Sequence, residues 1–184
     1  MGKKAIRQML KGMPVTKAEW ERDGQMALEA LKTFEPFKKA RTIAAYMPME
    51  QEVQIQPVLR LVLSEGKRLL LPRVVSKTDM AFFQVTELSG LEKSAYGILE
   101  PKAAAPRFEG AVDLVLIPLL ALSPNGVRLG HGGGYYDRYL HKNPAVTVAV
   151  VNKNRLFSPL PEEKHDVRVN CYIVEGKWYS CGGK

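Results

Sequence analysis

The segment RLGHGGGYYDRYL, residues 128–140, holds the residues of this chain best suited to chemistry. Four glycines fall within five positions, and two tyrosines, an aspartate and an arginine follow at once. A glycine-rich turn that opens a helix binds phosphate well, because backbone N–H groups converge, no Cβ blocks the approach, and the helix N-terminus is partly positive. Arg128 and His131 add side-chain donors. The pattern predicts a phosphate-binding loop, although a surface hairpin or Ω-loop without a ligand has similar composition.

This loop follows neither of the two common nucleotide-binding patterns. A Walker A loop ends in GK[ST], which does not occur here. A dinucleotide-binding GxGxxG would need a glycine where Tyr135 stands. The loop therefore predicts phosphate binding without naming the ligand.

Two carboxylates are candidates for a divalent cation. Asp137 starts the helix after the loop, where it can cap the helix or hold Mg²⁺ beside a bound phosphate. Asp166, in the polar segment LPEEKHDVRVN, is by itself typical of a turn. The adjacent Tyr135 and Tyr136 cannot both face inward from one helix, so at least one of them is expected to line the site.

Helices and strands that alternate along the chain must position these residues. TKAE, residues 16–19, is a capping box that opens an amphipathic helix. The expected helices cover residues 2–12, 16–34, 55–66 and 135–140, and the expected strands cover 42–48, 68–72, 80–85, 113–118, 146–151 and part of 171–179. Strands that read as continuous apolar runs between helices indicate a mostly parallel α/β sheet covered on both faces. No repeat or linker interrupts the chain, so we expect one domain, residues 1–184.

The edge of this sheet is the expected location of the site. Ligands of parallel α/β sheets bind beyond the carboxyl ends of the strands. Three loops follow such ends and should share one rim: residues 47–54, 72–79 and 118–134.

Composition narrows the classes of protein and ligand. The chain has 184 residues, a formal net charge of +8 and two cysteines, Cys171 and Cys181. No apolar run approaches the roughly 18 residues of a membrane helix, and the basic N-terminus lacks a signal-peptide core, so we expect a cytoplasmic protein with free thiols and no membrane partner. The basic residues are scattered along the sequence, which favours a small anionic ligand over nucleic acid.

Several short motifs, in this order, carry a resemblance that covers nearly the whole chain. They are KKAIR (3–7), YMPMEQEV (46–53), GKRLLLPR (66–73), YGILEP (96–101), DLVLIP (113–118), GVRLGHGGGYYDRYL (126–140) and LPEEKHD (160–166). Together they resemble the 5-formyltetrahydrofolate cyclo-ligase family, also called 5,10-methenyltetrahydrofolate synthetases.

The resemblance implies a fold and a reaction. The fold is a three-layer α/β sandwich, with a mostly parallel sheet of the kind seen in sugar-phosphate isomerases and CoA transferases. The reaction is the ATP- and Mg²⁺-dependent conversion of 5-formyltetrahydrofolate to 5,10-methenyltetrahydrofolate, with ADP and phosphate released. The implied partner is a reduced folate that can carry a polyglutamate tail, and the enzyme is expected to be a monomer that binds no nucleic acid.

The resemblance also assigns residues, position by position. ATP is expected to contact Lys3, Lys4, Arg7, Arg128, Leu129, Gly130, His131, Gly132, Gly133, Gly134, Tyr135 and Tyr136. The folate is expected to contact Arg7, Met47, Glu52, Tyr96, His131, Gly132, Gly133, Gly134 and Tyr135. Arg128, His131 and Tyr135 are the expected catalytic residues, and Asp137 and Asp166 the expected Mg²⁺ ligands.

Three other functions fit parts of the sequence. An RNA-binding module would use the net charge and would show salt-sensitive binding. A sugar-phosphate isomerase of the same broad fold would release no ADP. A folate-binding regulator would bind the 5-formyl compound tightly and form little product.

Overall fold

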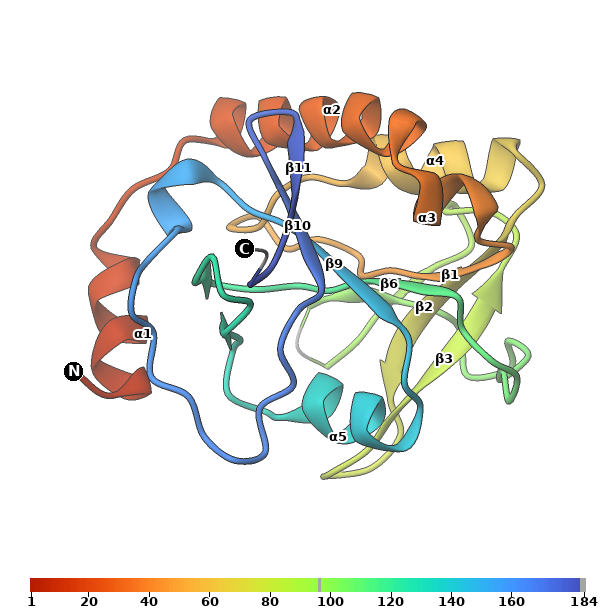
Figure 1. The fold of residues 1–184 in the computed structure, drawn as a ribbon. Coiled ribbons are helices and arrows are strands. Elements are labelled where there is room, and N and C mark those ends of the chain that lie inside the picture. Colours follow the sequence, from red (N-terminus) through yellow and green to blue (C-terminus); the bar gives the residue numbers. More distant parts are fainter. Residues whose placement is uncertain (96, 183–184) are drawn as a thin grey trace.

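Seven strands lie side by side in one sheet at the centre of the molecule (Figure 1). The structure, a computed structural model, describes residues 1–95 and 97–182. In spatial order the strands are β11 (Lys177–Ser180), β10 (Cys171–Val174), β9 (Val146–Val150), β6 (Leu114–Leu116), β1 (Thr42–Ala44), β2 (Arg68–Val74) and β3 (Met80–Val85).

The five inner strands are parallel to one another, and the two edge strands are antiparallel to their neighbours. The central β1 and β6 are buried at every position, as their apolar sequences predict. The edges reverse because short turns join them to the preceding strand. Glu175 and Gly176, between β10 and β11, have φ values of 47° and 76°, which a tight hairpin turn requires. The mostly parallel sheet expected from the sequence is confirmed.

Helices cover both faces of this sheet, which gives three layers (Figure 1). One face carries α2 (Lys17–Thr33), α3 (Glu35–Lys39) and α4 (Gln56–Ser64), and the other carries α5 (Tyr135–Lys142). A separate core cluster fills each interface. The three-layer α/β fold is thus confirmed.

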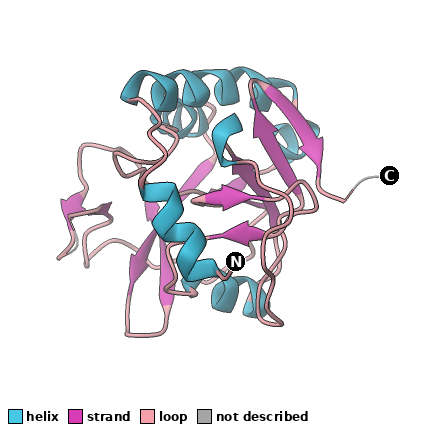
Figure 2. Ribbon diagram, turned by 90° about the vertical axis from the view of Figure 1, so that its left-hand side faces the viewer, coloured by secondary structure: helices cyan, strands magenta, loops and turns pink. Residues whose placement is uncertain are grey.

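The first helix, α1 (Lys3–Lys11), stands apart from these layers. Ile6 and Leu10 on its buried face pack against a small hairpin of β7 (Ala121–Leu122) and β8 (Arg128–Leu129). Figure 2 shows α1 lying across that side of the molecule. This position brings the N-terminus beside the loop that follows β8.

Local sequence signals act where they were expected. The Thr16 hydroxyl accepts a hydrogen bond from the Glu19 N–H, and the Glu19 carboxylate accepts one from the Thr16 N–H, so the capping box is present. Pro57 lies in the first turn of α4, and Gly66, with φ of 68°, follows its end. The strand expected over 42–48 is shorter, because after β1 the chain leaves the sheet to form the rim loop.

Two more small elements lie in regions expected to be loops. β4 (Glu92–Lys93) and β5 (Leu99–Glu100) form a hairpin, and the short helix η1 (Lys153–Arg155) follows β9. The β7–β8 hairpin interrupts the expected rim loop 118–134. None of the helices within residues 1–95 and 97–182 is long and apolar enough to cross a membrane.

Candidate active site

The glycine loop, residues 130–134, connects β8 to α5. Gly132 and Gly134 have φ values of 107° and 67°, a region that side chains rarely tolerate, so glycine is required at both positions. Gly134 is the N-cap of α5, whose first N–H groups therefore face the loop. A Cβ on Gly132 would lie 3.4 Å from the guanidinium of Arg7, so α1 approaches the loop closely. The loop is an open cradle of backbone beside a cation.

An ion pair beneath this loop joins β8 to α5. Nη2 of Arg128 lies 2.9 Å from Oδ2 of Asp137, and both side chains are largely buried. Nη1 of Arg128 donates to the carbonyl of Pro118, and Oδ1 of Asp137 accepts from the N–H of Val167 at 3.0 Å. Asp137 thus ties α5 to the loop that carries Asp166, instead of capping the helix.

Tyr135 and Tyr136 point in different directions from the first turn of α5, and both rings pack partly against the core. The Tyr135 hydroxyl donates to the carbonyl of Lys77, which joins the glycine loop to the rim loop after β2. The Tyr136 ring lies against Phe82 and the Arg128 guanidinium. Both residues are only partly buried, and the prediction that at least one of them lines the site stays a prediction.

Two polar atoms of this region are buried without a partner among the described residues. The Tyr136 hydroxyl and Nε of Arg128 have no hydrogen-bond partner in the described part of the chain. Burial, followed by the nearby charge of Glu52, raises the pKa of Tyr136 far above its ordinary value, so its hydroxyl keeps its proton. The site therefore contains a neutral phenol as a donor.

The rim loop after β1 brings Glu52 to the glycine loop. Its carboxylate is 5% exposed, and Oε1 lies 2.9 Å from Nε2 of His131. Oε2 accepts from the N–H of Met49 at 2.8 Å. Met47, on the same loop, packs partly against the core. Glu52 and His131, 79 residues apart in sequence, thus form one polar pair.

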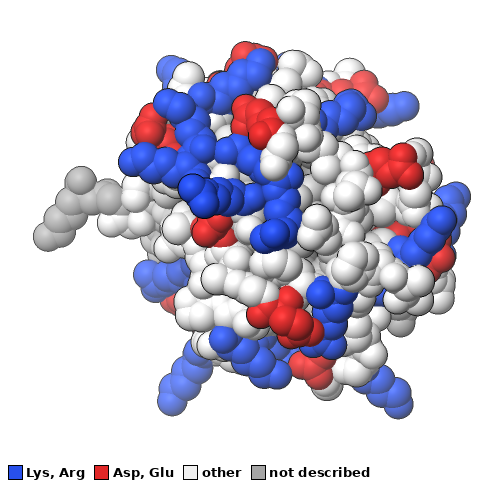
Figure 3. Space-filling model, turned by 90° about the vertical axis from the view of Figure 1, so that its right-hand side faces the viewer, with Lys and Arg blue, Asp and Glu red and all other residues white. Residues whose placement is uncertain are grey.

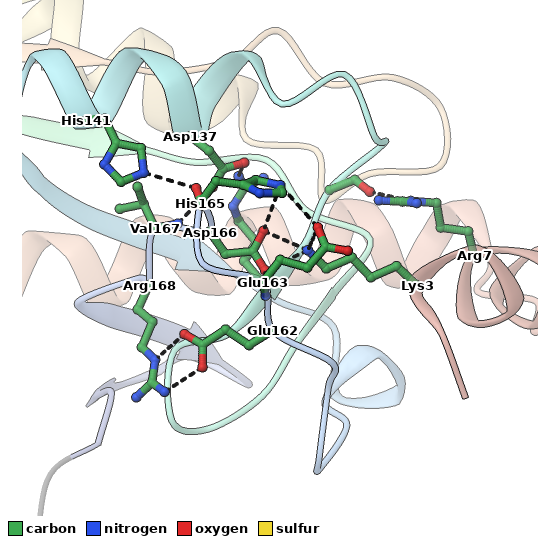
Figure 4. A network of polar contacts seen from close by, with 12 residues as sticks. Lys3, Arg7, Asp137, His141, Glu162, Glu163, His165, Asp166, Val167 and Arg168 are labelled. Carbon is green, nitrogen blue, oxygen red and sulfur yellow. Dashed lines mark hydrogen bonds and ion pairs between the residues drawn. The ribbon is translucent and has the colours of Figure 1, made fainter.

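Helix α1 closes the other side of the site (Figure 4). Lys3 and Arg7 are four residues apart and share one face of this helix. Nε of Arg7 donates to the Gly130 carbonyl at 2.9 Å. Nζ of Lys3 lies 2.7 and 2.6 Å from the two carboxylate oxygens of Asp166, and 3.1 Å from the Glu163 carboxylate. The N-terminal helix is therefore bound to both the glycine loop and the segment around Asp166.

The charges of Lys3 and Asp166 support each other. Burial opposes charge on Lys3, but hydrogen bonds to Asp166 and Glu163 raise its pKa above the ordinary value. Burial likewise opposes ionisation of Asp166, and the bonds from Lys3 and from the N–H of Glu163 outweigh it, so the pKa of this carboxyl is lowered. Both groups are charged at neutral pH, and Asp166 already holds a cation.

The comparisons with known proteins agree with this geometry. Residues 1–175 match the model of the 5-formyltetrahydrofolate cyclo-ligase family. The chain belongs to that family. The 5-formyltetrahydrofolate cyclo-ligase of Mycolicibacterium smegmatis is 36% identical over 137 residues, which cover 69% of this chain and 70% of that protein. The Escherichia coli K12 enzyme of the same name is 28% identical, over 94% and 97% of the two chains.

Solved structures give the same family. The NMR structure of Aquifex aeolicus 5,10-methenyltetrahydrofolate synthetase has a TM-score of 0.86 and 30% identity, over 100% of this chain and 95% of that one. A Mycoplasma pneumoniae 5,10-methenyltetrahydrofolate synthetase, 23% identical with a TM-score of 0.73, shares the fold. As a member of the cyclo-ligase family, the chain is a ligase of folate one-carbon metabolism.

The structure brings some of the residues expected from the sequence together in this candidate site, and leaves others outside it. Lys3, Arg7, Glu52, Asp166 and the glycine loop converge, as described above. Lys4 is exposed, because its place on α1 is turned away from the face that carries Lys3 and Arg7. Tyr96 lies outside the described residues.

The expected Mg²⁺ ligands suit that ion by type. Mg²⁺ prefers carboxylate oxygens and needs only one or two of them besides phosphate and water. Asp137 accepts from the N–H of Val167, the residue that follows Asp166, and Asp166 accepts from the ammonium of Lys3. In the described part of the chain, Glu163, His165 and Asp166 also place one ligand atom each within 4.8 Å of one another. The donor set therefore fits a hard divalent cation.

Three contributors were missed by the sequence reasoning. Arg138 donates to the carbonyls of Gly133 and Thr78, and so supports the glycine loop from outside. Arg155 donates to the carbonyls of Leu10 and Met13, which anchors the end of α1. The third is Gln54, which contacts the loop of Glu52. Their bonds go to backbone carbonyls, which no side-chain pattern reveals.

Proposed function

We propose that this enzyme catalyses the ATP- and Mg²⁺-dependent cyclisation of 5-formyltetrahydrofolate to 5,10-methenyltetrahydrofolate, with release of ADP and phosphate. One observation carries the proposal: helix α1, from the far end of the chain, brings Arg7 onto the Gly130 carbonyl of the loop that opens α5, and brings Lys3, one turn away, onto Asp166. Backbone N–H groups, a helix N-terminus and two cations together suit the polyphosphate of a nucleotide. Family membership supports the folate half of the reaction.

The chemistry explains the need for ATP. A formamide is a poor electrophile, because its nitrogen donates electron density to the carbonyl. In the proposed first step the formyl oxygen bonds to the γ-phosphorus and ADP leaves. N10 of the same folate then bonds to the formyl carbon, the carbon–oxygen bond breaks, phosphate leaves, and N10 loses its proton. The work of the protein is mostly to position the reactants and to stabilise charge.

The proposed nucleotide contacts are the glycine loop and the basic residues around it. Lys3, Lys4, Arg7 and residues 128–136 would contact the phosphates. Arg128 is held in place by Asp137, so its charge lies at a fixed position under the loop. When bound at Asp137 and Asp166, Mg²⁺ would neutralise phosphate charge.

The proposed folate contacts lie on the side of Glu52. Its carboxylate suits the pterin, whose N3–H and 2-amino group form a paired donor edge. Arg7, Met47, His131 and Tyr135, with the three glycines after His131, complete the proposed contacts. Tyr96 is a further proposed contact.

The test is direct. Purified protein is mixed with 5-formyltetrahydrofolate and Mg²⁺, with and without ATP, and the near-ultraviolet absorbance of the conjugated methenyl product is followed. We expect an absorbance rise only with ATP, and one ADP for each product. Product without ADP, or ADP without product, would refute the proposed reaction. Absence of both from folded protein would also refute it.

The Mg²⁺ ligands are tested with Asp137→Asn. We expect turnover to fall by about 100-fold or more, because the variant loses a charged ligand for the Mg²⁺ that would neutralise the phosphates. The unfolding free energy should also fall, by about 1–3 kcal/mol, because Arg128 loses its opposite charge and the single oxygen of asparagine cannot accept from both Arg128 and the N–H of Val167.

The matched control is Asp113→Asn. Oδ2 of Asp113 accepts from the N–H groups of Arg41 and Thr42, at the opposite end of β1 from the site. This variant should lose similar stability and keep its turnover. Wild-type turnover in Asp137→Asn, assayed well below its melting temperature, would remove the metal role.

Location and assembly complete the proposal. Cys171 and Cys181 are both free, which is compatible with a cytoplasmic enzyme. We expect a monomer that carries a complete site, and sedimentation of the purified protein measures this.

A further inference from the structure

We propose that Gln54 is a positioning residue, which fixes Glu52 against the glycine loop and thereby sets the affinity for the folate more than the affinity for the nucleotide. The inference rests on the proposed function, because it takes Glu52 to face the folate. Gln54 lies two residues after Glu52, where the rim loop meets α4.

The amide of Gln54 holds the turn that carries Glu52. Its Nε2 donates to the carbonyls of Met49 and Glu52, at 2.7 Å each. Both amide hydrogens are therefore used, and they close the same turn that the Glu52 N–H closes by donating to Met49. A methionine or glutamate at position 54 has no such pair of donors.

Gln54 is itself fixed by helix α2. Its N–H donates to the carbonyl of Trp20, and its Oε1 accepts from Gln56 at 3.1 Å. Its backbone carbonyl lies very close to Gly24, and a Cβ built on Gly24 would come within 1.9 Å of the carbonyl oxygen of Gln54. A continuous set of contacts thus runs from α2 through Gln54 and Glu52 to His131.

This support matters because the Glu52 carboxylate is buried. A carboxylate withdrawn from water needs fixed donors, and here these are the N–H of Met49 and the ring of His131. If the turn loosens, the Glu52 side chain can rotate towards water. Ordering this side chain again on binding then reduces the affinity for the folate. Of the proposed nucleotide contacts, His131 is bonded to Glu52, whereas Lys3 and Arg7 on α1 are bonded elsewhere, so the effect on the nucleotide should be smaller.

The experiment compares Gln54→Met with Gln51→Met, the same substitution at an exposed position of the same loop. Steady-state kinetics are measured with each substrate varied in turn. We expect Gln54→Met to raise the KM for 5-formyltetrahydrofolate about tenfold, through lost preorganisation, and to leave the KM for ATP within about twofold. Gln51→Met should change neither. An unchanged folate KM, or equal changes in both KM values and in kcat, would overturn the inference.

A spectroscopic measurement separates this inference from the proposed reaction. The chain has three histidines, so ring ¹⁵N–¹H spectra are simple to assign. Gln54→Met should move the His131 signals in the same direction as Glu52→Gln does, and leave His141 and His165 in place. Signals of His131 that stay unchanged, or signals of all three rings that move together, would overturn it even if the enzyme had another reaction.

A second variant, Gln54→Glu, tests the same inference if Gln54→Met folds poorly. Gln54→Glu keeps the shape of the side chain and places a carboxylate oxygen opposite two carbonyls. It should move the His131 signals and raise the folate KM at least as much. A smaller effect than that of Gln54→Met would contradict the role of the two donated bonds.

Discussion

At the scale of single residues, the site contains groups that stabilise the fold and a group that does not. Arg128 forms an ion pair with Asp137, and Lys3 forms one with Asp166. The Tyr136 hydroxyl, by contrast, is buried without a partner in the described chain. A buried hydroxyl that makes no hydrogen bond lowers stability, so its presence in a site is informative.

Tyr136→Phe tests this directly. We expect the ligand-free variant to keep its unfolding free energy or to gain up to about 1 kcal/mol, because the removed hydroxyl had no protein partner. The ring should still pack against Phe82. Urea unfolding provides the measurement.

Tyr46→Phe is the matched control, because the buried Tyr46 hydroxyl donates to the carbonyl of Val53 at 3.4 Å. That variant should lose about 0.5–1 kcal/mol. A larger loss in Tyr136→Phe than in the control would show that an internal water molecule satisfies the Tyr136 hydroxyl.

At the scale of elements, helices α1 and α2 lie close to the loops of the site and hold them in position. Helix α2 carries a glycine at position 24, where the carbonyl of Gln54 touches the helix. Helix α1 is held at its start by Lys3 and at its end by Arg155. Helix α2 thus supports the site through Gln54, and helix α1 supports it through Asp166 and Gly130.

The variant Gly24→Ala compares two opposite effects on the unfolding free energy: the higher helix propensity of alanine and the clash of its Cβ with Gln54. Alanine favours a helix interior by about 1 kcal/mol over glycine. The clash with Gln54 should outweigh this gain, and we expect a net loss of about 1–3 kcal/mol in the unfolding free energy. In the control, Gly12→Ala, the new Cβ meets only the Met9 carbonyl at 3.5 Å. Equal stability of the two variants would mean that α2 moves away without cost.

The Lys3–Asp166 pair makes the docking of α1 depend on pH. Because the folded-state pKa of Asp166 is lowered, its contribution to stability is complete above the unfolded pKa and is lost as the pH falls through the folded pKa. The unfolding free-energy difference between the wild type and Lys3→Met should therefore be largest near neutral pH and shrink below about pH 4. Lys4→Met, at an exposed position, should show no such trend. A difference that stays constant down to pH 3 would contradict the pairing.

The sequence predicted what depends on periodicity and local chemistry. Apolar runs located the inner strands, the capping box located α2, and the glycines located the loop before α5. It could not predict that β3 and β11 run antiparallel, since an apolar pattern carries no direction. Nor could it pair Glu52 with His131 or Arg128 with Asp137, because such pairs depend on how distant segments meet.

At the scale of the whole molecule, charges that are scattered in the sequence gather in space. Figure 3 shows one face of the molecule on which Lys and Arg form a continuous group at the upper left. With a net charge of +8, the protein attracts anions from a distance. This field does not distinguish one anion from another, and the specific contacts lie in the site.

Salt should weaken this attraction. We expect kcat/KM for 5-formyltetrahydrofolate to fall as salt is raised to about 0.15 M, and to fall more steeply when the folate carries several glutamates, because screening acts on each charge. The comparison of mono- and polyglutamyl substrates at each salt concentration is the measurement. Equal slopes would show that the tail lies outside the field of the protein.

The bonds of α1 also bear on protein synthesis. Lys3 binds Asp166 across 163 residues of sequence, and Arg7 binds Gly130 across 123. Contacts of such long range form late in folding, because the loop between them must close first. A chain still emerging from the ribosome can form β1 and β2 early, but the cradle lacks its full set of charges until residue 166 has left the exit tunnel. The proposed nucleotide binding would therefore be one of the last properties that a newly made molecule acquires.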